Sequence, residues 1–269
     1  MAIHANAIVE DGAKLGAGVE IGPFCVVGGD VVLGDGVRLF SHVSITGRTE
    51  IGARTVIHPH AALGGEGQIR KNDFPEARLV IGDDNVIRES VTMSCGSRKG
   101  GGVTRIGNNG YFMAYSHVGH DCVVGNECTF ANSVALGGHV HVGDNVTIGG
   151  NTAVQQFCRI GRLAMVGGLT GVNRDVIPFG IAHGDHVMLA GLNLIGLKRR
   201  GLSRETINGL RGAYRAIFRD ARGKLNDRAL AAKKNWVKIS EVQELADFVL
   251  ADAKQSVCTA RRKGDADED

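Results

Sequence analysis

The stretch CVVGNECTFANSVALGGHVHVGDNVTIGG, residues 122–150, repeats one pattern every six residues. A large apolar residue fills every sixth position, and a small or β-branched residue stands two positions before it. The large residues are Val124, Phe130, Leu136, Val142 and Ile148, and the small ones are Cys122, Cys128, Val134, Val140 and Val146. Because side chains alternate across a strand, both columns point to one side, and each six-residue unit must also contain a bend.

The same step extends well beyond this stretch. It runs from Leu15 to Leu63 and, after an irregular region, from Ile106 to Val172. Glycine follows most of the large residues, and we expect it to supply the unusual φ of each bend. Hexapeptide repetition is typical of a parallel β-helix, in which each unit buries its inner face by stacking on the next. Three such units would form one triangular coil.

Two segments interrupt the repeat. GEGQIRKNDFPEA, residues 65–77, predicts an external loop, and the span from Leu63 to Ile81 is interpreted as one full coil. SCGSRKGGGVT, residues 94–104, shifts the phase by one residue and predicts a second loop or a bulge. Long loops on a rigid scaffold often carry function.

The six-residue step ends near residue 185, where helical spacing begins. Amphipathic stripes follow at Ile207, Leu210, Tyr214, Ile217 and Phe218, and at Val242, Leu245, Phe248 and Val249. The sequence therefore predicts a β-helical domain over residues 1–184 and a helical domain over residues 185–269.

Composition and charge argue against several other classes of protein. The 40 glycines lack the every-third-residue spacing of collagen. The net charge is +3, and basic residues form no stripe with interleaved aromatics, so no nucleic-acid partner is expected. No secretion signal and no long apolar run occur, which predicts a cytoplasmic protein without stable membrane insertion. The six cysteines form no CxxC pair, and four of them occupy the small inward column: Cys25, Cys122, Cys128 and Cys158.

One column of the repeat has the parts of a reactive site. His120, Gly138 and Gln156 are each separated by three six-residue units and would stack at a bend, with His139 beside them. An imidazole base near an unobstructed backbone N–H suits acyl transfer, although exposed histidines are also common as solvated surface groups. A flat coil would need a second wall from a neighbouring subunit, for which a closed trimer is a natural symmetry. The basic cluster Lys198, Arg199 and Arg200 suits a diphosphate.

Several longer motifs resemble a known family. IGPFCVVG, IRESVTM, HVGHDCVVGN, VQQFCRIG, MVGG and GLKRRG followed by SRE resemble the UDP-N-acetylglucosamine acyltransferases that begin lipid A synthesis in Gram-negative bacteria. The resemblance implies an all-β left-handed parallel β-helix with a C-terminal α-helical domain, assembled as a homotrimer. It also implies transfer of a 3-hydroxyacyl chain from acyl carrier protein to the 3-hydroxyl of a UDP-glucosamine-type sugar. No resident cofactor is implied, because phosphopantetheine arrives on the carrier protein.

The resemblance also implies roles for individual residues. His120 is similar to the general base, Asp121 to its orienting neighbour and Gly138 to the oxyanion donor. Substrate contacts are implied at Gln68, Lys71, His117, His139, Gln155, Gln156, Asn193, Arg199 and Arg200. Gly168 falls where the family measures acyl length, and its lack of a side chain implies a longer chain. By charge alone, and not from the resemblance, three arginines are candidates for contact with the acidic carrier protein, although scattered arginines are more often plain surface: Arg159, Arg162 and Arg174.

Three positions depart from the family pattern, and alternatives stay open. Gln155 replaces a histidine, Ile195 an acidic residue and Ile69 an aspartate. These departures lie around the acceptor, so a 3-amino UDP-sugar acylated to an amide is one alternative. Others are an acetyl-CoA-dependent acetyltransferase and a noncatalytic sugar-nucleotide or carrier-binding scaffold. No metal site is expected, although a zinc hydratase would place zinc among His117, His120, His139 and His141.

Overall fold

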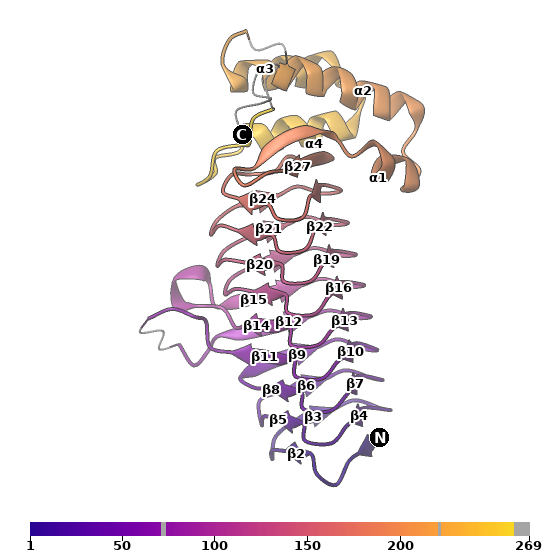
Figure 1. Ribbon diagram of the computed structural model, residues 1–269, viewed down its shortest axis with the longest axis vertical. Coiled ribbons are helices and arrows are strands. Elements are labelled where there is room, and N and C mark those ends of the chain that lie inside the picture. The colour runs from indigo at the N-terminus through magenta and orange to yellow at the C-terminus, as the bar shows by residue number, and fades with distance from the viewer. Residues whose placement is uncertain (71–73, 220–221, 261–269) are drawn as a thin grey trace.

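The computed structural model describes residues 1–70, 74–219 and 222–260. The chain winds as a stack of three-sided coils, and helices cover the C-terminal end of the stack (Figure 1). Each coil gives one short strand to each of three sheets, here called sheets A, B and C. The fold is a left-handed parallel β-helix followed by α-helices: the repeat predicts the β-helix, and the family resemblance implies its hand.

The strands pair in parallel from coil to coil, apart from the last pair of sheet A. Sheet A contains β1 (Ala2–Ile3), β4 (Glu20–Ile21), β7 (Arg38–Leu39), β10 (Val56–Ile57), β13 (Val86–Ile87), β16 (Tyr111–Phe112), β19 (Thr129–Phe130), β22 (Thr147–Ile148), β25 (Met165–Val166), β27 (Gly180–His183) and β28 (Met188–Leu192). Sheet B contains β2 (Ile8–Val9), β5 (Val26–Val27), β8 (Ser44–Ile45), β11 (Ala62–Gly65), β14 (Thr92–Ser94), β17 (His117–Val118), β20 (Ala135–Leu136), β23 (Ala153–Val154) and β26 (Gly171–Val172). Sheet C contains β3 (Lys14–Leu15), β6 (Val32–Leu33), β9 (Arg48–Ile51), β12 (Arg78–Ile81), β15 (Val103–Ile106), β18 (Val123–Val124), β21 (His141–Val142) and β24 (Arg159–Ile160).

The register along the sheets measures the length of each coil. Glu20 pairs with Ala2, so an uninterrupted coil is three six-residue steps long. In sheet C, Ile81 pairs with Ile51 and Ile106 pairs with Ile81, so these two coils are both longer. The interpretation of Leu63 to Ile81 as one full coil is wrong, because Leu63 lies in sheet B and Ile81 in sheet C. That span consists of one six-residue step and a 12-residue insertion.

Both insertions leave the stack at the corner where sheet B passes into sheet C. The first joins β11 to β12, and the second joins β14 to β15 and contains the short helix η1 (Arg98–Gly100). Figure 1 shows both segments projecting from the same side of the stack. The second insertion confirms the loop predicted from the one-residue phase shift, since seven extra residues change a six-residue phase by one.

The corners correct one expectation about glycine. Most left-handed corner positions of the coils hold other residues, among them Asp121 with φ of 60° and His139 with φ of 60°. The glycines after the large apolar residues are needed for close approach instead. A Cβ on Gly107 would lie 2.7 Å from the backbone carbon of Gly125 in the next coil. Glycine here lets successive corners stack, rather than letting each corner turn.

The two inward columns form one continuous buried core. Phe112 and Phe130 pack edge to face with centroids 5.1 Å apart, and both are fully buried. The four cysteines of the small inward column are buried, as their register predicts, and Cys95 and Cys258 are buried as well; none of the six forms a disulfide. The thiol of Cys122 donates to the carbonyl of Gly137 at 3.0 Å, and burial raises its pKa to about 12. Such a thiol is inert packing rather than a nucleophile.

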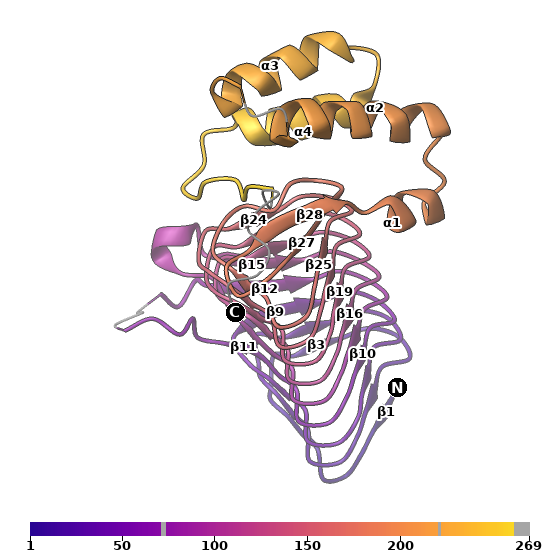
Figure 2. The same ribbon diagram turned by 45° about the horizontal axis from the view of Figure 1, so that its top comes forward.

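The C-terminal helices sit on the last coils (Figure 2). They are α1 (Leu194–Arg199), α2 (Arg204–Tyr214) continued by the π-helical turn η2 (Arg215–Arg219), α3 (Leu225–Asn235) and α4 (Ser240–Leu250). Within the described residues, no helix is long and apolar enough to cross a membrane. Sheet A continues through β28 to Leu192, beyond the boundary at residue 184 that the sequence predicts for the β-helical domain. The division of the chain into two domains stays a prediction.

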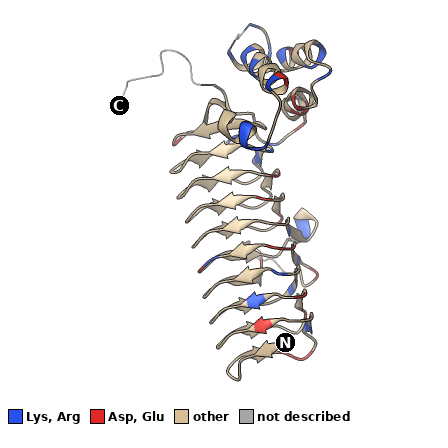
Figure 3. Ribbon diagram, turned by 90° about the vertical axis from the view of Figure 1, so that its right-hand side faces the viewer, with Lys and Arg blue, Asp and Glu red and all other residues tan. Residues whose placement is uncertain are grey.

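An ion pair and a hydrogen bond join α4 to the coil. Arg162 pairs with Glu244 at 2.7 Å, and the buried carboxylate of Asp175 pairs with Arg159 at 2.7 Å. Arg159 also donates to the carbonyl of Phe248 at 3.1 Å. Basic ribbon segments recur on the helices, whereas most of the coil is uncharged in Figure 3. Arg159 and Arg162, proposed from the sequence as carrier-protein contacts, are therefore engaged in holding α4.

Candidate active site

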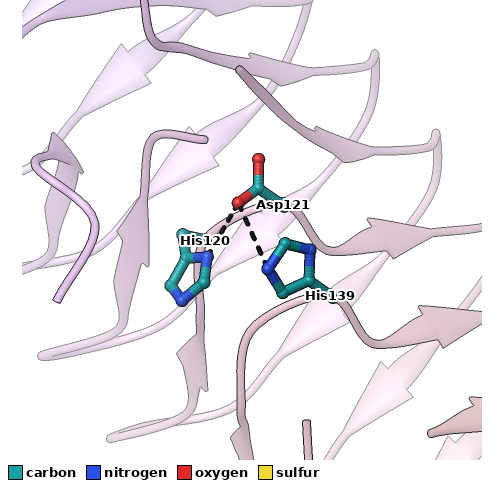
Figure 4. Close-up of side chains that lie close together, drawn as sticks. All are labelled: His120, Asp121 and His139. Carbon is teal, nitrogen blue, oxygen red and sulfur yellow. Dashed lines mark hydrogen bonds and ion pairs between the residues drawn. The ribbon is translucent and has the colours of Figure 1, made fainter. Parts of the chain in front are cut away.

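Two successive corners between sheets B and C bring three polar side chains together. His120 and Asp121 lie between β17 and β18, and Gly138 and His139 lie one coil later, between β20 and β21. Nδ1 of His120 is 2.7 Å from Oδ2 of Asp121, and Nε2 of His139 is 3.8 Å from the same oxygen (Figure 4). The two imidazole rings meet edge to face with centroids 4.9 Å apart.

The carboxylate of Asp121 determines which ring nitrogen of His120 carries the hydrogen in the neutral imidazole. Burial acts to raise the pKa of Asp121, but hydrogen bonds from Ser97 and His120 outweigh it, and the pKa lies below its usual value. The ionised carboxylate can only accept, so Nδ1 of His120 must carry the hydrogen between them. Nε2 is then left with a free lone pair. His120 is therefore held in the tautomer that can act as a base.

Gly138 lies directly against the ring of His120. A Cβ at this position would be 2.3 Å from Cε1 and 2.4 Å from Nε2 of that ring. The backbone N–H of Gly138 has no hydrogen-bond acceptor among residues 1–70, 74–219 and 222–260. At the equivalent position of another corner, the N–H of Asn126 donates to Oδ1 of Asp144 at 2.6 Å. An unpaired N–H beside a base can stabilise a developing oxyanion.

His139 is held from two sides. On one side it contacts the His120–Asp121 dyad, and on the other it packs against the next coil. Its ring stacks on Phe157 with centroids 4.5 Å apart and planes within 9° of each other. Burial lowers its pKa, and the charge of Asp121 only partly offsets this. We therefore describe His139 as a neutral imidazole at neutral pH, suited to hydrogen bonding rather than to binding a phosphate by charge.

His117 lies on the outer face of sheet B, one strand before the dyad. Its Nδ1 is 2.7 Å from the hydroxyl of Thr92 on the neighbouring strand β14. Burial lowers the pKa of His117, and the nearby His120 lowers it further. Thr92 and the exposed Gln68 line one shallow depression over sheet B. His117 lies next to this depression, because it is hydrogen-bonded to Thr92. Gln68 and His117 thus face the same outer surface.

Comparisons with known proteins decide the family. A family model described as Udp N-acetylglucosamine O-acyltransferase, Domain 2, matches residues 175–258. An acyl-[acyl-carrier-protein]–UDP-N-acetylglucosamine O-acyltransferase of Rhizobium rhizogenes is 45% identical over 260 residues, covering 97% of this chain and 96% of the relative. The chain belongs to the UDP-N-acetylglucosamine O-acyltransferase family.

Solved structures of the UDP-N-acetylglucosamine O-acyltransferase family match over nearly the whole chain. LpxA from Acinetobacter baumannii superposes with a TM-score of 0.92 at 36% identity, covering 96% of this chain and all of that one. UDP-N-acetylglucosamine acyltransferase from Campylobacter jejuni superposes with a TM-score of 0.90 at 33% identity, covering 96% and 100%. The family resemblance predicted from the motifs is confirmed.

Three residues expected to bind the sugar nucleotide lie near the corner between sheets C and A, whereas His120 lies at the corner between sheets B and C. Arg200 pairs with Glu127 at 2.6 Å, at the corner where sheet C passes into sheet A, and Arg199 is exposed beside it. Asn193 caps α1 by accepting from the N–H of Gly196 at 3.0 Å and donates to the carbonyl of Leu163 at 3.0 Å. Within one chain, the structure does not bring these residues to His120.

The remaining expected residues are spread along two corners. Gln155 and Gln156 are exposed on the corner above Gly138, and the backbone of Gln156 accepts from Gln255 at 3.0 Å. Gly168 is exposed at the corner between sheets A and B, away from the dyad. Lys71 lies outside the described residues.

A metal would compete with bonds that already hold the acyltransferase dyad. His120, Asp121 and His139 offer possible ligand atoms within 4.8 Å of one another. Asp121 already accepts from His120 and Ser97, and His117 is bound to Thr92. His141 lies exposed on β21, in sheet C. The four histidines considered for zinc therefore do not converge as one set.

Sequence reasoning missed Ser97 and Thr92. Both lie on or next to coils that carry an insertion, so the regular coil spacing does not align them with the histidine and aspartate that they touch. The phase shift over residues 94–104 signals an insertion at this place, but no sequence pattern identifies Ser97 as the residue that contacts Asp121.

Proposed function

We propose that this protein transfers a 3-hydroxyacyl chain from acyl carrier protein to the 3-hydroxyl of UDP-N-acetylglucosamine, the first step of lipid A synthesis. The observation that carries this proposal is the setting of His120: its Nδ1 is 2.7 Å from Asp121, and its ring lies against Gly138, whose N–H has no acceptor among the described residues. The names of relatives that are 42–45% identical to this chain, acyl-[acyl-carrier-protein]–UDP-N-acetylglucosamine O-acyltransferases, support the donor and the acceptor.

In this proposal His120 acts twice. Nε2 takes the proton of the sugar 3-hydroxyl as its oxygen attacks the thioester carbonyl. The carbonyl oxygen becomes negative and accepts the hydrogen bond of the Gly138 N–H. Collapse breaks the carbon–sulfur bond, and the imidazolium returns its proton to the leaving thiol. Asp121 stabilises the imidazolium between these two steps.

The protein holds no cofactor of its own in this scheme. The thioester and its phosphopantetheine arrive with the carrier protein, and no step requires a metal. We place the reaction in the cytoplasm. Transfer that survives extensive dialysis against a chelator is the expected result, and loss of activity that zinc restores would contradict the scheme.

We further propose that the complete site forms between copies in a homotrimer. Arg199 and Arg200 suit the diphosphate, yet they lie at the corner between sheets C and A, whereas His120 lies at the corner between sheets B and C. A neighbouring copy can bring one corner against the other. Large exposed apolar residues also recur at the corners between sheets A and B, as expected for a covered surface: Phe24, Tyr115 and Leu169.

The acceptor atom is the part of the proposal that most needs a direct test. Relatives are named O-acyltransferases, which supports the hydroxyl. Gln155, Ile195 and Ile69 are all exposed, so they remain available to contact an acceptor, and the 3-amino sugar stays the alternative. Equal amounts of the two UDP-sugars offered with one 3-hydroxyacyl carrier protein decide between them. Faster transfer to the hydroxyl sugar is expected, and transfer to the amine alone would overturn this assignment.

A further inference from the structure

We infer that Ser97 is a positioning residue for the catalytic dyad, supplied by the seven-residue insertion between β14 and β15. The inference rests on the proposed function of His120 and Asp121. Ser97 acts through Asp121: among the described residues it forms hydrogen bonds with that carboxylate and none with either imidazole.

Ser97 donates to both oxygens of the Asp121 carboxylate. Its backbone N–H donates to Oδ1 at 2.8 Å, and its hydroxyl donates to Oδ2 at 2.5 Å. Ser97 is 2% exposed and Asp121 is 4% exposed, so water does not replace these bonds. Oδ2 also accepts from Nδ1 of His120 at 2.7 Å. The serine hydroxyl and the imidazole therefore share one carboxylate oxygen.

The backbone around Ser97 is itself fixed. Its carbonyl accepts from the N–H of Gly100 at 3.1 Å and from that of Gly102 at 2.9 Å. A Cβ on Gly100 would lie 2.0 Å from the carboxyl carbon of Asp121, so the turn lies flat on the carboxylate. Phe74, from the first insertion, packs against Gly102: a Cβ on Gly102 would lie 2.6 Å from Cε1 of the Phe74 ring. This packed turn, residues 97–102, is called the serine clamp below.

The serine clamp has a chemical consequence for the base. Two donors from Ser97 stabilise the ionised carboxylate, which fixes the direction of the Nδ1–H bond and hence of Nε2. They also withdraw negative charge from Oδ2, which limits how strongly Asp121 stabilises the imidazolium. Loss of the hydroxyl should therefore raise the apparent pKa of the dyad and leave the imidazole less well oriented.

Other titratable groups around the dyad do not obscure this effect. His117 and His139 interact with it electrostatically, and burial lowers the pKa of both imidazoles. The thiol of Cys122, next to Asp121, has a pKa raised by burial to about 12. All three groups are therefore neutral near pH 7, and they are identical in the wild type and in Ser97→Ala, so a difference between the two titrations reports on the serine.

The matched variants are Ser97→Ala, Ser97→Thr and Ser203→Ala. Ser97→Ala removes the hydroxyl donor, and Ser97→Thr keeps it. Ser203→Ala is the control for a purely structural loss, because its hydroxyl accepts from the N–H of Thr206 at 3.0 Å and caps α2, far along the chain from the dyad. For each protein we would measure kcat, KM for UDP-N-acetylglucosamine, the pH profile of kcat/KM and thermal unfolding.

Ser97→Ala should lower kcat by about ten- to hundredfold, as expected for a buried bond to a charged group, and leave KM within about twofold. The acid limb of its pH profile should shift to higher pH. Ser97→Thr should restore both values, and Ser203→Ala should lower only the unfolding temperature. A Ser97→Ala enzyme with the kcat and acid limb of the wild type overturns the inference, as does a shift in the pH profile that Ser203→Ala reproduces.

A second readout keeps this inference separate from the proposed reaction. NMR titration of the imidazole nitrogens of His120 reports its apparent pKa without any substrate. A higher apparent pKa in Ser97→Ala than in the wild type supports the serine clamp, even if no transfer to either UDP-sugar is found and the proposed function fails. An unchanged titration overturns the serine clamp, whatever the activity of the wild type.

Discussion

The imidazole of His120 lies against the α-carbon of Gly138, one coil later, where a Cβ would be only 2.3 Å from the ring. The backbone of one coil thus supports the base carried by the coil before it. This contact places the free Nε2 beside an unpaired N–H and depends on the absence of one side chain.

Gly138→Ala is therefore expected to displace the ring of His120. Transfer activity should fall by at least about a hundredfold, the lower end of what general base catalysis contributes. Steady-state kinetics would measure the loss. The matched control is Gly28→Ala at the same kind of corner, where the nearest atom to a new Cβ is 3.5 Å away. Equal effects of the two changes would show that the contact with His120 is not special.

Asp121→Asn keeps the size of the side chain and removes its charge. The amide can donate as well as accept, so it no longer keeps the hydrogen of His120 on Nδ1, and it cannot stabilise the imidazolium by charge. We therefore expect kcat to fall by about a hundred- to ten-thousandfold. Affinity for UDP-N-acetylglucosamine, measured by calorimetry, should change little. A variant with nearly full activity would mean that Asp121 only holds the corner together.

Asp121 also predicts how stability depends on pH. Its pKa is lower in the folded protein than in the unfolded chain, so the folded state favours the ionised form. The stability it contributes is fully present above the unfolded pKa of about 4 and is lost as pH falls through the folded value. Denaturant unfolding at pH 7 and pH 3 should show a smaller difference for Asp121→Asn than for the wild type. An identical difference would contradict the lowered pKa.

A shared site between copies predicts rescue between two impaired variants. His120→Ala lacks the base, and Arg200→Ala should raise KM for the UDP-sugar. In trimers that mix the two chains equally, about a quarter of the sites combine a native His120 with a native Arg200 from the neighbour. Co-expressed variants should therefore recover about that share of activity at low sugar concentration. No recovery from verified mixed trimers would place both residues in one chain's site.

The sequence predicts local periodicity well and insertions poorly. The inward columns and the stacking of His120 on Gly138 follow from one spacing, because the coils between residues 106 and 172 have the same length. The prediction that Leu63 and Ile81 are one full coil apart is wrong, because a spacing of three six-residue steps also arises from one step and a 12-residue insertion. The burial of His120 and the contact of Ser97 with Asp121 depend on how the insertion folds back, which no repeat encodes.

Other misses have similar physical causes. Glycine was expected at left-handed corners, yet Asp121 and His139 occupy such corners, since the constraint at glycine is the distance to the next coil. The sequence predicts that Arg200 contacts the substrate diphosphate, but within a single chain Arg200 pairs with Glu127, at a different corner from the dyad. A motif carries information on chemistry without stating which copy of the chain supplies each residue.

The most direct test of His120 as the general base is a transfer assay with 3-hydroxyacyl carrier protein and UDP-N-acetylglucosamine, using wild type, His120→Ala and His141→Ala. His141 lies exposed on β21 and serves as the matched histidine control. Transfer by the wild type and by His141→Ala is expected, with a loss of about a hundred- to ten-thousandfold in His120→Ala. Wild-type activity in His120→Ala would contradict the assignment of the base.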